Sequence, residues 1–332
     1  MKVLHVVPGL ASRTGGPAVS AVESSVAVRE CGVEAAILAP DAADAPWSKS
    51  RRRVTAAELP AGAESLDVRL FPTRTPWRLR FSPGLYRALG RHCRAFDVVH
   101  IHSLFLFPQW AAYHQAAQAG VPYIVSPRGA LDPYLRRRGR LRKAATDRLW
   151  QNAMFERAAA LHLTSDEEAR LVADIAPSVP RAVVPNGIHW ERFQQLPARA
   201  DFRARRLGGF AGPVVLNLGR ISYKKGLEVL IRAFALVRQR VGDARLVIAG
   251  PDDEGLQPRL VEVARNEGVG AEVIFVGMVS GREKLAALAA ADVWALSSYT
   301  ENFGIAVVEA LACGLPSVIS PAVNLAPEIE RE

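Results

Sequence analysis

The feature that most constrains the fold is an alternation of short apolar segments with longer helical ones, clearest in the second half of the chain. The apolar segments are rich in Val, Ile and Leu, which is typical of strands buried on both faces of a sheet. We expect strands at 214–218, 245–249, 273–276, 293–296 and 317–319. Strands that alternate with helices form parallel sheets, so this half predicts a doubly wound α/β domain.

The first half repeats the pattern less regularly. We expect strands at 3–7, 34–39, 96–102, 123–126, 160–164 and 182–185. Helices are expected at 18–30, 141–159 and 167–173, and another follows the strand ending at 102 and continues to residue 118. The polar stretch 41–65 is expected to be loop. Because 332 residues are long for one core, the sequence predicts two domains, 1–190 and 208–332, with a linker near 187–212.

The composition indicates where the protein works. Hydrophobic residues make up 49% of the chain, as is typical of a folded protein. The cysteines Cys31, Cys93 and Cys313 have no metal or redox spacing, so we expect buried free thiols in a reducing, cytoplasmic compartment. No apolar run reaches the ~18 residues of a spanning helix, and the first residues read as a strand rather than a signal peptide.

The net charge of +9 is concentrated in the first part of the chain. Residues 1–206 contain 30 Lys and Arg against 18 Asp and Glu, whereas residues 207–332 contain 12 against 15. Nucleic acid is one partner that such an excess can indicate, but no nucleic-acid recognition module accompanies it. We therefore expect no nucleic-acid partner and favour a membrane surface with anionic lipids.

Arg220 and Lys225 follow the strand expected at 214–218. In Gly219-Arg220-Ile-Ser-Tyr-Lys-Lys225-Gly226, a glycine turn, a guanidinium and an ammonium group share a short loop that leads into a helix. Arginine offers a planar fork of donors and lysine a point charge, a pair suited to a diphosphate. We therefore expect Arg220 and Lys225 to bind phosphate.

Two carboxylates, Glu301 and Glu309, stand eight residues apart after the strand expected at 293–296. We expect Glu301 in the loop after this strand and Glu309 about two turns into a helix that starts near Phe303. Free amides at a helix N-terminus form a ready anion site. Carboxylates that can bind sugar hydroxyls, next to amides that can bind phosphate, suit a nucleotide-sugar donor. Two Glu at this spacing, taken alone, are as often surface residues.

With both motifs present in this order, the chain resembles family 4 of the glycosyltransferases, a retaining group with the GT-B fold. The family's Gly-Arg…Lys-Gly motif begins here at Gly219 and its Glu-x7-Glu motif at Glu301. The resemblance implies an α/β fold of two Rossmann-like domains that face one another across a cleft, the first for the acceptor and the second for the nucleotide sugar. It also implies that family members continue past residue 332, so we expect a chain truncated at its C-terminus or an unusually short member of the family.

The resemblance implies roles for these residues. The co-substrate would be a nucleoside diphosphate sugar, with no cofactor and no metal, because Arg220 and Lys225 would neutralise the leaving diphosphate. Glu301 would hold hydroxyls of the donor sugar, and Glu309 would hold the ribose. The remaining expected donor contacts come from the loop between the two carboxylates: Asn302, Phe303, Gly304 and Ile305.

The first half supplies weaker candidates. Gly15 and Gly16 follow the first strand, where glycine lets the backbone approach a ligand closely. A glycine pair alone is usually a turn, but in the family this loop lies against the donor phosphate or the acceptor. His100 and His102 share one face of a strand, and the sequence offers no further metal ligands beside them. We expect His102, at the strand end, to be a site residue, and His100 is equally well explained as a core residue.

Arg128 stands in a Ser-Pro-Arg-Gly segment after the strand expected at 123–126. Many family members have a histidine near this position, and the arginine is similar to that of a subgroup that builds polysaccharides. An arginine cannot act as a base near neutral pH, but it can bind phosphate or a sugar hydroxyl. The alternative is a structural arginine that braces the loop.

The densest basic tract is 136–143, with Leu141, Leu149 and Trp150 in or near it. A solvated basic face explains such a tract, and so does a patch that lies in lipid headgroups. The segment around Trp77, with its neighbouring arginines, is expected to extend the same surface. Both explanations stay open from the sequence.

Together these patterns predict a hexosyltransferase that moves a sugar from a nucleoside diphosphate sugar to an acceptor hydroxyl with retention. The acceptor would be a lipid-linked molecule or a glycan, and the pathway would be cell-surface polysaccharide or glycolipid synthesis. The protein would be located in the cytoplasm and at the inner face of the plasma membrane. One alternative is a nucleotide-sugar epimerase or hydrolase on the same fold. Another is a sugar-nucleotide-binding protein without turnover.

Overall fold

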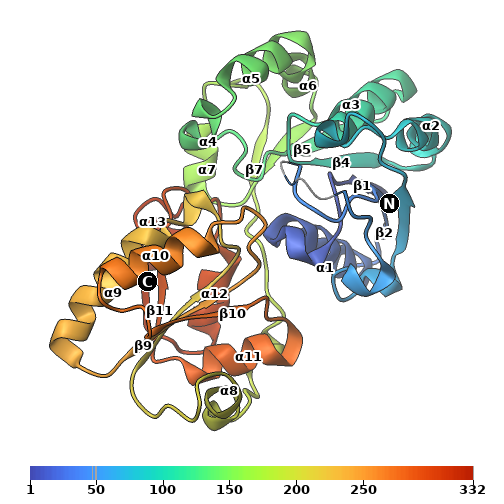
Figure 1. Ribbon diagram of the computed structural model, residues 1–332. Coiled ribbons are helices and arrows are strands. Elements are labelled where there is room, and N and C mark those ends of the chain that lie inside the picture. The colour runs from blue at the N-terminus through green and yellow to red at the C-terminus, as the bar shows by residue number, and fades with distance from the viewer. Residues whose placement is uncertain (47, 49–50, 332) are drawn as a thin grey trace. The chain divides into compact units, whose positions relative to one another are not determined.

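The structure is a computed structural model that describes residues 1–46, 48 and 51–331. Its contacts divide the chain into two compact units, Met1–Gly187 (unit 1) and Ile188–Glu332 (unit 2), drawn in blue to green and in yellow to red in Figure 1. Each unit is a parallel sheet with helices on its faces. The stretch that follows Gly187 belongs to unit 2, because Phe193 and Phe202 are buried in its core.

Unit 1 contains a sheet of seven parallel strands in the order β3-β2-β1-β4-β5-β6-β7. The strands are β1 (Lys2–Val6), β2 (Glu34–Pro40), β3 (Asp67–Phe71), β4 (Val98–His102), β5 (Tyr123–Ser126), β6 (Ala160–Leu163) and β7 (Arg181–Val183). The helices are α1 (Gly16–Glu30), α2 (Pro83–His92), α3 (Phe107–Ala119), α4 (Pro133–Arg137), α5 (Arg140–Thr146), α6 (Asn152–Glu156) and α7 (Asp166–Leu171).

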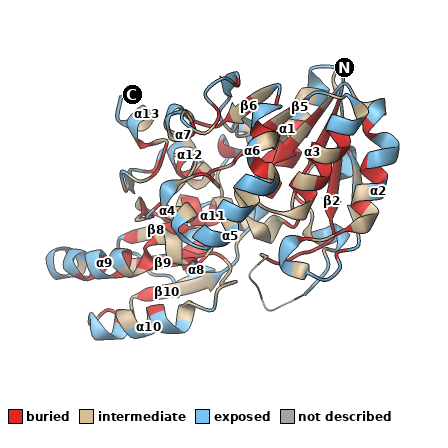
Figure 2. Cartoon of the chain, turned by 90° about the horizontal axis from the view of Figure 1, so that it is seen from above, coloured by how far each residue is buried: buried red, intermediate tan, exposed pale blue. Residues whose placement is uncertain are grey.

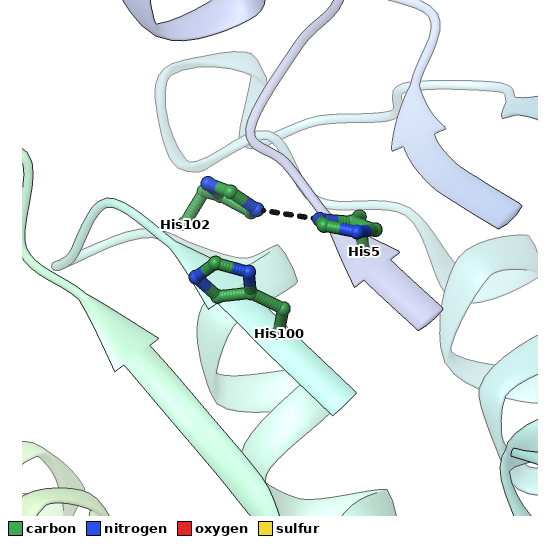
Figure 3. Close-up of side chains that lie close together, drawn as sticks. All are labelled: His5, His100 and His102. Atoms are coloured by element: carbon green, nitrogen blue, oxygen red, sulfur yellow. Dashed lines mark hydrogen bonds between the residues drawn. The ribbon is translucent and has the colours of Figure 1, made fainter. Parts of the chain in front are cut away.

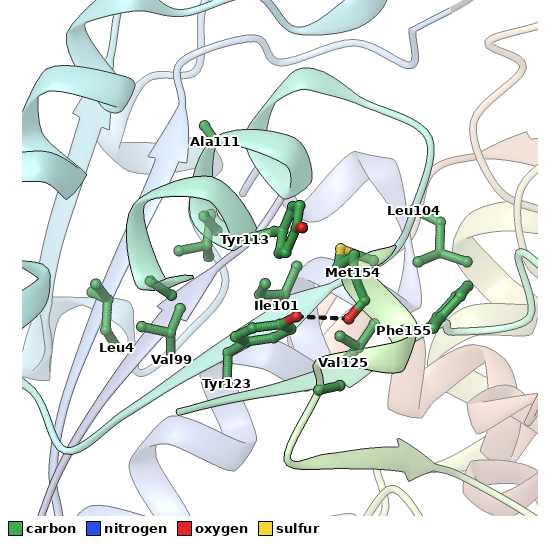
Figure 4. Close-up of a cluster of buried hydrophobic side chains, with 14 of the residues drawn as sticks. Leu4, Val99, Ile101, Leu104, Ala111, Tyr113, Tyr123, Val125, Met154 and Phe155 are labelled. Atoms are coloured by element: carbon green, nitrogen blue, oxygen red, sulfur yellow. Dashed lines mark hydrogen bonds between the residues drawn. The ribbon is translucent and has the colours of Figure 1, made fainter. Parts of the chain in front are cut away.

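Apolar side chains from the central strands and their covering helices form the core of unit 1 (Figure 4). Val99 and Ile101 of β4 are fully buried there. The buried Tyr123 satisfies its hydroxyl by donating to the Met154 carbonyl at 2.8 Å. Buried polar groups need such partners, and this bond ties β5 to α6.

Unit 2 contains five parallel strands in the order β10-β9-β8-β11-β12. The strands are β8 (Val214–Leu218), β9 (Arg245–Ala249), β10 (Val273–Gly277), β11 (Val293–Leu296) and β12 (Ser317–Ile319). The helices are α8 (Arg199–Arg206), α9 (Leu227–Val241), α10 (Gln257–Asn266), α11 (Gly281–Ala290), α12 (Ile305–Ala312) and α13 (Ala326–Arg331). The central strands β8, β9 and β11 are mostly buried, whereas the edge strands β10 and β12 are mostly half-buried or exposed. Figure 2 shows the outer faces of α9 and α10 exposed, as expected for helices that cover a sheet.

Both sheets have the strand order of a Rossmann fold. The order reverses between β1 and β4 in unit 1 and between β8 and β11 in unit 2. Ligands of such sheets bind outside the carboxyl ends of the strands at this reversal. The loops after these four strands are therefore where a site is expected.

Three expectations from the sequence are wrong in detail. β3 and α2 were not predicted, and the helix expected at 141–159 is interrupted by a π turn at Asp147–Gln151 and ends at Glu156. Of the three cysteines expected to be buried, only Cys93 is, whereas Cys313 is half-buried and Cys31 is exposed just after the end of α1. Within the loop expected at 41–65, residues 47, 49 and 50 lie outside the described residues.

Candidate functional site

A lysine and a glutamate meet between two loops of unit 2. Lys225 lies in the turn after β8, and Glu301 lies in the loop after β11. Their side chains form an ion pair and are only 13% and 14% exposed. Because β8 and β11 are hydrogen-bonded neighbours, their carboxyl ends bring the two motifs together at the reversal of strand order.

Backbone contacts fix this arrangement. The Ser297 hydroxyl donates to the carbonyls of Lys225 at 3.0 Å and Gly226 at 2.8 Å, and the Tyr299 amide donates to the Lys224 carbonyl at 2.7 Å. Gly226 has φ +59°, and a Cβ there would lie 2.2 Å from the Ser297 carbonyl oxygen. Only glycine fits this close approach, which explains the glycine that ends the motif.

The surroundings of Glu301 keep it ionised. Burial alone would raise its pKa, but the nearby charges of Lys224, Lys225 and Arg220 and the Lys225 hydrogen bond lower the pKa to about 2. The backbone on either side is held by the Glu301 amide, which donates to Ala322, and by the Asn324 amide, which donates to Glu301. Glu301 is thus a fixed, ionised acceptor at neutral pH and not a proton donor.

Arg220 lies in the same loop as Lys225, partly buried, and forms no ion pair with a described residue. The loop comes very close to the next strand, since a Cβ on Gly250 would lie 1.8 Å from the Gly219 carbonyl oxygen. Glu254, after β9, accepts from the Ser222 hydroxyl at 2.7 Å and anchors the loop. Glu254 is not among the residues predicted from the sequence, although an acidic residue just after a neighbouring strand could have indicated it.

Glu309 is paired with Lys284, which is likewise not among the residues predicted from the sequence. The Lys284 ammonium of α11 lies 2.5 Å from a carboxylate oxygen of Glu309, and the Glu309 side chain is 12% exposed. Helix α12 begins at Ile305, two residues later than expected, so Glu309 lies just over one turn into it. The carboxylate is thereby held in one orientation.

The residues between the two carboxylates shape the loop. Gly304 has φ +76°, and a side chain there would crowd Glu301 Cγ at 3.3 Å. Phe303 is buried in unit 2, whereas Asn302 is partly buried. The Phe303 side chain therefore serves packing, and its backbone, with that of Ile305, is what the loop can offer to a ligand.

Unit 1 places Arg128 beside His102. One Arg128 nitrogen donates to the Asn186 side-chain oxygen at 2.7 Å, and another lies 3.4 Å from His102 Nδ1. Arg128 has φ +53°, a strained backbone region for a side chain of this size. Burial lowers its pKa to about 10, against the opposing effect of Glu168, so it stays charged at neutral pH.

His100 and His102 point to the same face of β4, as expected, and His5 of β1 joins them (Figure 3). His5 Nδ1 lies 3.0 Å from His102 Nε2, and His100 Nε2 lies 2.8 Å from the Ser126 hydroxyl. Burial, followed by the charge of Arg128, lowers the pKa of His5 to about 3. Burial also holds the pKa values of His100 and His102 well below their usual value, so the cluster is neutral.

The glycine loop lies at the same edge of this sheet. Gly15 has φ +96° and precedes α1, which begins at Gly16. Ser20 of α1 donates to the same Asn186 oxygen that Arg128 contacts, at 3.0 Å. The structure therefore connects the glycine loop's helix, Arg128 and His102 through hydrogen bonds within unit 1.

The basic tract is exposed along α4 and α5. Leu141 and Leu149 are 86% and 80% exposed. Arg136 pairs with Asp147 at 2.6 Å. The expected extension around Trp77 is wrong in one respect, because Arg80 is buried and donates to the Asp44 carbonyl.

Known families match both units. The model for the glycosyl transferase 4-like domain matches residues 15–187, and the model for glycosyl transferases group 1 matches residues 209–332. The chain is a family 4 glycosyltransferase. The family membership predicted from the sequence motifs is thus confirmed.

Among similar proteins is the D-inositol 3-phosphate glycosyltransferase of Mycobacterium leprae, 30% identical over 98% of this chain and 76% of its own length. The corresponding enzyme of Rhodococcus erythropolis is 28% identical over 94% of this chain and 72% of its own. Among solved structures, Anabaena HepE in complex with UDP and glucose has a TM-score of 0.75 at 18% identity, covering 98% of this chain and 82% of HepE.

This glycosyltransferase therefore has the GT-B fold predicted from its motifs. Within the described residues, no helix combines the length and apolar character needed to cross a membrane.

Proposed function

We propose that this glycosyltransferase is a hexosyltransferase that moves a sugar from a nucleoside diphosphate sugar to an acceptor hydroxyl with retention of configuration. The observation that carries the proposal is the partly buried Lys225–Glu301 pair, with Arg220 beside it, at the strand reversal of unit 2. Arg220 and Lys225 suit the diphosphate of a nucleotide sugar, and the ionised carboxylate of Glu301 beside them suits the hydroxyls of its sugar. The solved relative HepE holds UDP and glucose, which supports this choice of donor.

In the proposed reaction, Arg220 and Lys225 stabilise the charge that develops on the leaving diphosphate, so the donor site needs no metal. Glu301 accepts hydrogen bonds from sugar hydroxyls, and Glu309 accepts those of the ribose. Its low pKa suits Glu301 for this role and not for proton donation. In unit 1, Arg128 and His102 are the proposed acceptor-side or phosphate contacts, together with the backbone at Gly15 and Gly16.

The test is release of nucleoside diphosphate from a panel of uridine, guanosine and adenosine diphosphate sugars, each with and without lipid-linked and glycan acceptors. Release that requires an acceptor, with a new glycoside as product, is the expected result. Acceptor-independent release would favour a hydrolase, and conversion of the donor sugar would favour an epimerase. Calorimetric binding of a donor without any turnover would favour a binding protein.

We also propose that the acceptor side works at an anionic membrane surface, in cell-surface polysaccharide or glycolipid synthesis. Arg137, Arg140 and Arg142 are exposed around the protruding Leu141. Basic residues with apolar neighbours lie readily in lipid headgroups. A lipid-linked acceptor would explain this surface.

Replacing Arg137, Arg140 and Arg142 together by Ser should weaken binding to anionic vesicles by roughly 100-fold, since each charge contributes about 1 kcal/mol there. Sedimentation with vesicles of phosphatidylcholine, with and without phosphatidylserine, measures this, and added salt should reduce binding. The matched control is the replacement of Arg205, Arg240 and Arg282, all exposed in unit 2, which should have little effect. Equal binding to both vesicle types would make the tract an ordinary solvated face.

A further inference from the structure

The histidine cluster of unit 1 brings together more imidazole groups than the proposed acceptor-side contact of His102 requires. His5, His100 and His102 each offer one ring nitrogen, and these three atoms lie within 4.8 Å of one another. The residues come from neighbouring strands, with His5 opposite His100 in the register of β1 and β4. His5 and His102 are buried, and His100 is partly buried. Figure 3 shows the three rings gathered at the carboxyl ends of these strands.

We propose that His5, His100 and His102 bind one divalent transition-metal ion of the Zn2+ type. Zinc binds imidazole nitrogen at about 2.0–2.1 Å, which places two ligand nitrogens of a tetrahedral site about 3.3 Å apart. His5 Nδ1 and His102 Nε2 are already 3.0 Å apart. An ion between His5 and His102 therefore needs only small shifts of these two side chains, whereas His100 has to move closer, because the ligand atoms of the whole cluster lie within 4.8 Å and not about 3.3 Å of one another.

The ligands select the kind of ion. The proposed ligands are three imidazoles, and no carboxylate of the described residues joins them. A fourth imidazole lies next to them, with His162 Nδ1 3.3 Å from His100 Nε2. Imidazole suits Zn2+, Cu2+, Ni2+ and Co2+, whereas Mg2+ and Ca2+ prefer oxygen ligands. The site is thus distinct from the phosphate-linked Mg2+ that other nucleotide enzymes use.

An ion at this site would replace the hydrogen bond that now joins His5 Nδ1 to His102 Nε2. His5 Nε2, the other nitrogen of that ring, is buried without a hydrogen-bond partner among the described residues, and an ion on Nδ1 leaves it unchanged. Arg128 approaches His102 at Nδ1, the nitrogen that does not face His5. With an ion on Nε2, the His102 proton resides on Nδ1, so the long 3.4 Å contact to Arg128 is given up while the 2.7 Å bond from Arg128 to Asn186 stays.

The ion would join β1 to β4 where the strand order of unit 1 reverses. None of the proposed ligands belongs to the donor residues of unit 2, so the inference does not depend on the proposed donor site. Of the three ligands, only His102 is also a proposed acceptor-side or phosphate contact. The expected consequence is a more stable unit 1, because an ion that binds only the folded state raises the unfolding temperature.

The test uses the full chain after treatment with a chelator. Titration with Zn2+ in competition with a metal indicator should show one equivalent bound, and Mg2+ should not compete. His5→Gln and His102→Gln should each weaken Zn2+ binding more than roughly tenfold, the loss already typical of a residue that only supports a ligand. The control His92→Gln removes an exposed histidine at the end of α2 and should leave the affinity unchanged.

Two further measurements keep the proposal testable if a variant does not fold. X-ray absorption at the zinc edge of the wild-type protein should show imidazole nitrogen ligands, and Zn2+ should raise its unfolding temperature. No bound equivalent, unchanged affinity in both His5→Gln and His102→Gln, or loss of the bound ion in His92→Gln would overturn the proposal.

Discussion

Replacing Arg220 or Lys225 by Ala should weaken binding of a nucleoside diphosphate by ~1.5–3 kcal/mol, the range for a hydrogen bond to a charged group. Both cations follow β8 and lie beside Glu301 in a partly buried loop. The charge of a diphosphate is thus met where water is partly excluded, and electrostatic attraction there is stronger than at an open surface. Isothermal calorimetry with UDP and GDP measures the loss.

The two variants should differ in stability. Lys225→Ala leaves the carboxylate of Glu301 partly buried without its ion-pair partner, which destabilises unit 2. Arg220→Ala removes no ion pair with a described residue, so it reports on ligand binding more cleanly. The control is Arg240→Ala, which deletes an exposed charge at the opposite end of α9. Unchanged UDP and GDP affinity in both site variants would remove these residues from the diphosphate site.

The sequence predicts the central strands well because they are short apolar runs between helices. The bounds of β8, β9, β11 and β12 agree with the expected ones. β3 was missed because it carries the exposed residues Asp67 and Arg69, so its pattern is not apolar. Such an edge strand is recognisable mainly by its pairing with β2.

The sequence predicts only those site residues that belong to a recognisable motif. Arg220, Lys225 and Glu301 follow strands that the alternation itself places side by side. The partners of these residues lie elsewhere in the sequence: Lys284 contacts Glu309 from α11, and His5 contacts His102 from β1. A lone lysine or histidine carries no local pattern, and only the folded register brings it to its partner.

Glu301→Gln and Glu309→Gln should separate sugar recognition from nucleotide recognition. If Glu301 holds the donor sugar, its loss should mostly spare UDP or GDP affinity and reduce the transfer rate by on the order of 100-fold, as loss of a positioned polar group does. If Glu309 holds the ribose, its loss should weaken both. Lys284→Met should follow Glu309→Gln, because Lys284 fixes the orientation of that carboxylate.

The comparison between affinity and rate decides this prediction. Glutamine keeps the size of the side chain and removes the charge, so packing in the loop changes little. Lys225 stays in place in Glu301→Gln and loses its only carboxylate partner among the described residues, which leaves its charge free for the diphosphate. Nucleotide affinity should therefore be retained or slightly increased in that variant. Equal losses of affinity and rate in Glu301→Gln and Glu309→Gln would show that the two carboxylates do not divide sugar and ribose between them.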